Sequence, residues 1–289
     1  MLPKNIFLTV DKLLSATFFS PTIPHLKIDL EFTDKAKLQS WASAAKKNYS
    51  LKTINHEYVK ASLTLKDLRV DGRLKLKGTT AIHHFGGKKW SYRVKTGDDR
   101  RLFGMKSFAI MDPVRRGNLW QIAYNFAARD EGLITKRYDL IDLTVNGEKI
   151  GVHVIEESLG VDLLESNFRR EGLILRLNAE SLWSEKAAYT LSPMEWGDYF
   201  YSAQLTADSE EAVFANPETR DSFYSISRKF EAFKRGSIQT HELFDVDQMA
   251  KFMATTAVFS GWHGALGFSV VFYLNPMTGK LEPDRKSVV

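Results

Sequence analysis

The chain has 289 residues, 44% of them hydrophobic, and no cysteine. It is therefore long enough to bury a large core, and it cannot form disulfides, thiolate metal sites or a cysteine nucleophile. Forty basic against 35 acidic residues give a net charge of +5, which is typical of a soluble surface but is also compatible with anionic ligands or polyanionic partners. Charges at Lys4, Asp11 and Lys12 interrupt the first apolar segment, so we expect neither a signal peptide nor a membrane span there.

Strand patterns dominate the first 157 residues. Apolar and polar residues alternate in LKIDLEF (26–32), YVKASLTLK (58–66), LRVDGRLKLKG (68–78), KKWSYRVKT (88–96) and MKSFAIMDP (105–113). Asp71-Gly72 predicts a turn or bulge within the third of these segments. Residues 33–48 and 118–132 have helical composition, with a cap at Thr33 or Asp34 and an end at Gly132.

A hairpin is the clearest local signal. Residues 138–157 form two β-rich runs around Asn146-Gly147, the preferred pair for a tight turn. Helical patterns then prevail, with strands at LILRLN (173–178) and VVFYLN (270–275), a helix break near Pro217 and a cap at Asp245 or Asp247. This segregation predicts an α+β protein with two lobes.

The strand KKWSYRVKT places cations on one face. A period of two puts Trp90, Tyr92 and Val94 on one side, and the other side carries Lys89, Ser91, Arg93 and Lys95. Three cations in a row could hold phosphate oxygens through charge-assisted hydrogen bonds. The alternative is the solvated side of an antiparallel strand, and spacing alone favours it.

Other polar residues have no obvious chemistry by themselves. Glu156 and Glu157 are adjacent on a strand, so at most one points inward easily, and an inward carboxylate needs a partner such as a lysine. His83-His84 would point in opposite directions and make a poor metal site. The remaining polar clusters are Arg115-Arg116, Arg169-Arg170 and His263, each of which has an ordinary structural explanation. Nucleotide-loop, zinc-protease and serine-hydrolase motifs are absent from the sequence.

Taken in order, these segments resemble the CotH-like spore-coat protein kinase family. The resemblance rests on residues 102–157, LFGMKSFAIMDPVRRGNLWQIAYNFAARDEGLITKRYDLIDLTVNGEKIGVHVIEE, and on the flanking KLKG, KKWSYRVK, LLESNFRREGLIL and FYLNPMTGKLEP. It covers the chain from about Ile28 to Pro283. Any one of these pieces is weak, whereas the ordered set is specific.

The resemblance implies an atypical protein-kinase-like fold with nucleotide between two lobes. It divides the chain into an N-terminal segment (1–25), a β-rich N-lobe (26–157), a mainly helical and incomplete C-lobe (158–283) and a tail (284–289). The implied activity is phosphorylation of protein Ser or Thr with ATP and Mg²⁺ or Mn²⁺. Such catalysis depends mainly on positioning and charge neutralisation.

The resemblance also assigns residues to the site. The basic strand motif falls on Lys89, Ser91, Arg93 and Lys95, so Lys95 or Lys89 is the candidate to hold phosphate, with Arg93 in support. The glutamate after the hairpin falls on Glu157, preferred to Glu156 as the partner of that lysine. Arg169 and Arg170 match an element whose role is structural or close to phosphate.

The sequence departs from the family where metal ligands and the catalytic acid are expected. His263 stands near the acidic position, as a low-ranked catalytic candidate, and Ser269 stands where the family has an asparagine, so metal ligation there is doubtful. After GKLEP the family continues into a strand with the main metal-binding aspartate, and this chain has DRKSVV instead. Asp284 comes early and beside Arg285 and Lys286 rather than apolar residues, so the main aspartate ligand is expected to be missing.

The final six residues have an unusual coding possibility. One back-translation of DRKSVV is GATCGGAAGAGCGTCGTG, which looks like a common short-read sequencing adapter. We therefore expect residues 284–289 to be non-native. The chain would then come from a truncated, metagenomic gene fragment, and we expect it to lack kinase activity. A different codon string in the coding DNA would refute this.

Three functions follow as alternatives. The first is a kinase of this family, extracytoplasmic and associated with the cell surface or spore coat, which acts on protein Ser or Thr. The second is a non-catalytic surface or coat-assembly scaffold that keeps the kinase-like fold. The third is a polyanion binder that uses the basic surface; no specific nucleic-acid partner is indicated, since aromatic and basic residues interleave only in KKWSYRVK.

Overall fold

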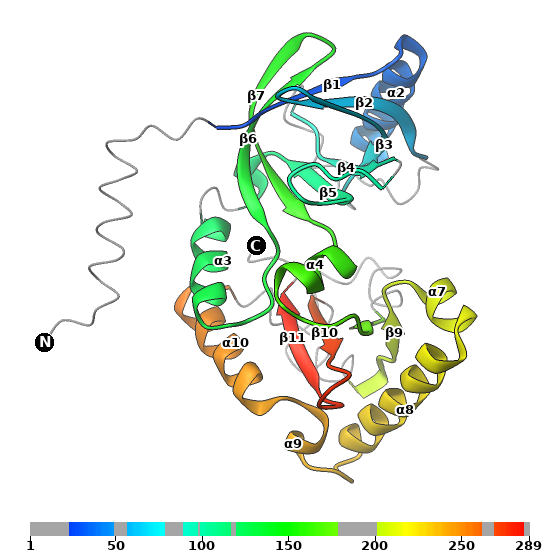
Figure 1. Ribbon diagram of the computed structural model, residues 1–289, viewed down its shortest axis with the longest axis vertical. Helices are drawn as coiled ribbons and strands as arrows, with labels where there is room; N and C mark the ends of the chain where they lie inside the picture. Colours follow the sequence, from blue (N-terminus) through cyan, green and yellow to red (C-terminus); the bar gives the residue numbers. More distant parts are fainter. Residues whose placement is uncertain are drawn as a thin grey trace, which may run out of the picture.

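The computed structural model describes residues 23–48, 57–78, 89–97, 99–116, 120–178, 201–261 and 269–285, with backbone alone at positions 48, 115, 116 and 285. In these ranges the chain is an α+β protein with a seven-stranded barrel, a four-stranded sheet and seven α-helices (Figure 1). The predicted α+β class is confirmed.

The barrel strands come from the first 157 residues: β1 (His25–Asp29), β2 (Val59–Leu65), β3 (Leu68–Leu76), β4 (Tyr92–Thr96), β5 (Ser107–Met111), β6 (Tyr138–Val145) and β7 (Glu148–Glu157). The second sheet contains β8 (Ile174–Leu177), β9 (Leu205–Ala207), β10 (Val270–Leu274) and β11 (Leu281–Arg285). The helices are α2 (Phe32–Asn48), α3 (Trp120–Asp130), α4 (Val161–Ser166), α7 (Glu210–Ala215), α8 (Pro217–Lys234), α9 (Thr240–Leu243) and α10 (Val246–Val258).

The barrel encloses one apolar core. Its strand order is β1-β2-β3-β4-β5-β7-β6, closed by a parallel pairing of β1 with β6. Alternate residues such as Leu74, Val94 and Phe108 are fully buried inside it, and α2 adds Leu38 and Ala45 to the same cluster. The other residues of each strand consequently face outward, which gives the barrel a second, chemically distinct surface.

The hairpin prediction is confirmed. β6 and β7 are joined at Asn146 and Gly147, whose φ values of 48° and 75° are those a two-residue hairpin turn requires. The Asn146 side chain also links the turn to β1, because its amide donates to the Leu30 carbonyl oxygen at 2.7 Å and its oxygen accepts from the Leu30 N–H at 2.9 Å.

The turn or bulge predicted at Asp71-Gly72 is wrong. β3 runs through both residues in unbroken register with β2 and β4, and the chain turns earlier, near Lys66, which has a φ of 53°. Gly72 is explained by space rather than by a turn, because a Cβ there would lie 2.6 Å from the Lys95 carbonyl oxygen. A glycine inside a strand can mark such a close approach of another backbone.

The second sheet, in the order β11-β10-β8-β9, lies below the barrel in Figure 1, between α10 and α8. The predicted helix break is confirmed, since α7 ends at Ala215 and α8 begins at Pro217 with Asn216 as its cap. Asp245 caps α10 by accepting a hydrogen bond from the Gln248 N–H at 3.1 Å. Among the helices of the described ranges, none is long and apolar enough to cross a membrane.

One buried histidine makes the stability of the barrel depend on pH. His153 on β7 is fully buried, and its Nδ1 donates to the Gly151 carbonyl oxygen at 2.9 Å. Burial lowers the pKa of His153, and the hydrogen bond to Gly151 opposes this only in part. The folded chain therefore holds this proton less tightly than the unfolded chain, so stability falls as the pH drops below about 6.5, the ordinary histidine pKa.

We expect this single group to contribute a slope of at most about 1.4 kcal/mol per pH unit below that pH. Urea unfolding between pH 5 and pH 8 measures it. The variant His153→Leu should lose this part of the slope, whereas His25→Gln, at an exposed histidine of β1, should keep it. An unchanged slope in His153→Leu would contradict the assignment.

Candidate functional site

A lysine–glutamate pair lies on the outward face of the barrel, where it has little contact with solvent. Lys77 follows β3, and its N–H continues the ladder to the Ser91 carbonyl oxygen at 2.8 Å. Because Leu74 and Leu76 point into the core, Lys77 points outward, where its Nζ lies 3.3 Å from Glu156 Oε1. The two side chains are only 14% and 9% exposed, so each charge helps to compensate the other in surroundings with little water.

Glu156 also borders a small polar pocket between the barrel and the lower sheet. The pocket has a volume of about 10 Å³, enough for one water molecule or one ion. The described residues around it are Gln121, Tyr124, Asn125, Ile134, Thr135, Lys136, Tyr138, Glu156 and Asp284. They come from α3, the α3–β6 connection, β6, β7 and β11, so five parts of the chain meet at this point.

Hydrogen bonds fix the polar side chains of α3 at the pocket. Gln121 Nε2 donates to Asn125 Oδ1 at 2.9 Å, and Asn125 Nδ2 donates to the Lys136 carbonyl oxygen at 3.1 Å. Both side chains are buried. The orientation of the two amides is therefore set by the fold, and their oxygens belong to the hard donor class that Mg²⁺ prefers.

The last strand brings a second carboxylate to this pocket. Asp284 lies in β11 opposite Val271 and forms an isolated β-bridge with Ile134. It is 3% exposed and, with Glu156, lines the pocket. Two carboxylates and two amides fit a divalent cation with oxygen ligands, although the described residues contain no cluster of three or more His, Asp or Glu that could hold a metal alone.

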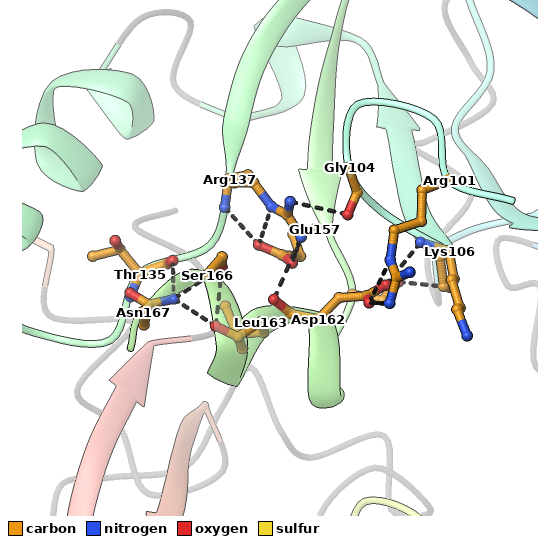
Figure 2. Close-up of polar contacts among 12 residues, drawn as sticks. Arg101, Gly104, Lys106, Thr135, Arg137, Glu157, Asp162, Leu163, Ser166 and Asn167 are labelled. Carbon is orange, nitrogen blue, oxygen red and sulfur yellow. Dashed lines mark hydrogen bonds and ion pairs between the residues drawn. The ribbon is translucent and has the colours of Figure 1, made fainter. Parts of the chain in front are cut away.

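The adjacent glutamate, Glu157, belongs to a different network, at the junction of the barrel and α4 (Figure 2). It is 1% exposed and accepts hydrogen bonds from the Arg137 backbone N–H and from Arg137 Nε, both at 3.0 Å. The same guanidinium donates to the carbonyl oxygens of Gly104, at 3.0 Å, and Asp162, at 3.4 Å. Arg137 thus connects the β6 entry, β7, the β4–β5 loop and α4.

Asp162, in the first turn of α4, extends this junction. Its carboxylate accepts from the Lys106 backbone N–H at 2.8 Å and from Arg101 Nη2 at 2.9 Å (Figure 2). Burial raises the pKa of Asp162, but the Lys106 N–H together with Arg101 and Arg137 outweighs burial and lowers it overall. The carboxylate therefore remains ionised and holds the loop before β5 against α4.

The predicted phosphate-holding residues lie on the same outer surface as Lys77. Arg93 and Lys95 are exposed on β4, where they pair in register with Lys75 and Arg73 of β3. Lys89 is half-buried just before β4. Ser91, predicted on the outward face, is instead completely buried.

The structure does not bring Glu157 to any of these cations. Glu157 pairs with Arg137, whereas Glu156 makes the contact with a lysine, and that lysine is Lys77. The reason is the alternation along β7: Glu156 shares the outward face, and Glu157 follows on the opposite face at the end of the strand.

The remaining predicted residues have structural surroundings or lie outside the described ranges. Ser269 is 3% exposed directly before β10. Arg169 Nε donates to Glu282 Oε2 at 2.8 Å, and the Arg170 carbonyl oxygen accepts from the Tyr273 hydroxyl at 2.8 Å. His263 lies outside the described residues, as do His83-His84 and the side chains of Arg115 and Arg116.

Sequence reasoning overlooked Lys77, Arg137 and the amides of α3. Lys77 stands in KLKG, one of the segments that carry the family resemblance. The alternation along β3 already places its side chain on the face opposite to that of Leu74 and Leu76. Asn125 stands in the segment NLWQIAYNFAARDEG, which was interpreted only as a helix. Arg137 had no signal, because its partner Glu157 is 20 residues away on another strand.

Comparison with known proteins gives no relative: no protein-family model matches the chain, and no curated protein matches its sequence.

Proposed function

We propose that the chain is part of an ATP-dependent, Mg²⁺- or Mn²⁺-dependent protein Ser/Thr kinase with an atypical kinase-like fold related to the CotH-like spore-coat kinases. The observation that carries the proposal is the Lys77–Glu156 ion pair at a polar pocket between the barrel and the lower sheet. Phosphoryl transfer requires a cation held in place for the phosphates and a carboxylate that holds this cation. The order of sequence segments supports the same proposal.

In this proposal the roles follow from the contacts. Lys77 binds phosphate oxygens through Nζ, and Glu156 holds that ammonium group at 3.3 Å. Burial of both side chains limits competition from water, so the cation acts in a region of low dielectric where charge stabilisation is strong. A metal ion held at the pocket would neutralise charge on the phosphates of ATP.

The pocket residues fit the metal rather than the nucleotide. A volume of about 10 Å³ accommodates one ion, and the carboxylate of Glu156 and the amides of Gln121 and Asn125 supply oxygen ligands. Asp284, at the end of β11, brings a second carboxylate to the same pocket.

ATP-induced thermal stabilisation tests the proposal. We expect ATP with Mg²⁺ to raise the Tm of the chain, since ligand at 100 times its Kd stabilises by about 2.7 kcal/mol. No shift in Tm would contradict the kinase proposal and favour the coat-assembly scaffold.

A position outside the cytoplasm, at the cell surface or spore coat, belongs to the same proposal. It is supported by the family resemblance and agrees with a sequence that has no cysteine. The acceptor is a protein with Ser or Thr hydroxyls. Metal-dependent phosphorylation of casein by the chain would support the kinase proposal, and it would contradict the expectation that the residues DRKSVV leave the chain inactive.

A further inference from the structure

Five cations gather on the outer surface of β2, β3 and β4, which we call the basic face: Lys60, Arg73, Lys75, Arg93 and Lys95. The register sets Lys60 opposite Arg73 and Arg73 opposite Lys95, and it sets Lys75 opposite Arg93. Four of the five are exposed, and Lys75 is half-buried. The cations thus form two adjacent cross-strand rows.

No member of the basic face makes an ion pair with any acid in the described part of the chain. Burial lowers the pKa of Lys75, and the nearby charges of Arg93 and Lys95 lower it further. Like charges held this close repel one another. An anionic ligand would remove this repulsion, so the surface favours one.

The basic face has acidic residues at one end and the candidate site at the other. Beyond the Lys60–Arg73–Lys95 row, the same hollow of about 800 Å³ is lined by three acids and one further cation: Asp29, Glu31, Asp71 and Arg69. In the other direction Lys77, directly after β3, follows Lys75 and reaches Glu156. The positive charge therefore runs along the strands toward the proposed site of transfer, and at the far end it meets a mixed group in which acids predominate.

We infer that the basic face binds an acidic, extended segment of a protein, and on the basis of the proposed function this segment belongs to the acceptor. The spacing supports an extended peptide: residues two apart on a strand are about 6.6–7 Å apart, and a peptide with acids at every second position has the same repeat. Charge complementarity also orients and accelerates the encounter.

The aromatic residue of this surface favours a peptide over single-stranded nucleic acid. Tyr58 lies beneath three cations, with Arg73 at 5.2 Å, Lys75 at 5.0 Å and Lys95 at 5.5 Å from its ring centroid. Single-stranded nucleic acids bind proteins through bases that stack on accessible aromatic rings. A ring already occupied by cations offers less of that interaction, whereas carboxylates need only the cations.

Binding of a fluorescent twelve-residue peptide of alternating Asp and Ser, measured by anisotropy without nucleotide, tests the inference. We expect the triple variant Arg73→Gln/Lys75→Gln/Lys95→Gln to bind at least about tenfold more weakly than the unchanged chain. The matched control Lys47→Gln/Arg228→Gln/Arg235→Gln removes three exposed cations elsewhere and should stay within about twofold. Circular dichroism establishes that both variants are folded.

Three outcomes would overturn the inference: no peptide binding by the unchanged chain, equal weakening in both triple variants, or tighter binding of a twelve-nucleotide thymidine oligomer through the same residues. A fall in affinity with rising salt is expected in addition. Because the assay contains no nucleotide, its failure is separable from failure of the proposed function. Phosphate transfer by a chain that does not bind the peptide overturns only the inference about the acceptor.

Discussion

Replacing Lys77 by Met is expected to reduce phosphate transfer by about a thousandfold or more. The substitution removes the Lys77–Glu156 ion pair and leaves that carboxylate to repel the phosphates. Because the interaction stabilises the charge that develops during transfer, the loss should appear mainly in kcat rather than KM. Release of labelled phosphate onto an acceptor protein from γ-labelled ATP measures it.

Lys149→Met is the matched control for this experiment. Lys149 is an exposed lysine on β7 of the same barrel, and its pair with Asp142 spans 3.3 Å at the surface. An exposed pair of this kind contributes at most about 1 kcal/mol to stability, so activity should be unchanged. Equal activity in Lys77→Met and the unchanged chain would show that Lys77 does not hold the phosphates.

Arg137→Met is expected to cause the largest loss of stability among the substitutions considered. It leaves Glu157, whose side chain is fully buried, without its guanidinium partner, and it also removes the contacts to Gly104 and Asp162 (Figure 2). Removal of one partner of a buried ion pair costs about 3–5 kcal/mol. We therefore expect a decrease of about 3 kcal/mol in the free energy of unfolding, measured by urea denaturation.

Arg101→Met tests whether burial is the cause. Arg101 pairs with Asp162 at 2.9 Å in the same network, but its side chain is 43% exposed, so the expected loss is about 1 kcal/mol or less. A loss for Arg101→Met as large as that for Arg137→Met would show that the junction depends on the network as a whole and not on the buried Glu157.

Local patterns were sufficient for much of the fold. The alternation in residues 58–66 and 68–78, the Asn146-Gly147 turn, the helix break near Pro217 and a cap at Asp245 or Asp247 were recognised because each depends on neighbours in the sequence. Gly72 misled the prediction, since a glycine inside a strand and a glycine in a turn give the same local signal. Only the nearby Lys95 carbonyl oxygen distinguishes them.

The candidate site was harder to predict because its contacts join distant segments. Lys77 and Glu156 are 79 residues apart, and Arg137, directly before β6, is 20 residues from Glu157 at the end of β7. From the sequence, Glu156 and Glu157 differ only in the face of β7 that each occupies, and the register that fixes this face comes from pairing with β5 and β6. The basic strand KKWSYRVKT was recognised from the sequence, whereas the contact between Lys77 and Glu156 was not.

The surroundings of Asp284 differ from those expected from its sequence neighbours Arg285 and Lys286. Asp284 occupies β11 and lines the pocket with Glu156, a position where a metal-binding carboxylate is expected. The pairing of β11 with β10 creates these surroundings, and the local sequence does not reveal that pairing.

The most direct measurement of the kinase proposal is transfer of the γ-phosphate of ATP to protein Ser or Thr by the chain. The proposal predicts phosphoserine or phosphothreonine on an acceptor protein in the presence of Mg²⁺ or Mn²⁺, and loss of this product when EDTA removes the metal. Bound ATP with no phosphorylated protein under either condition would contradict it.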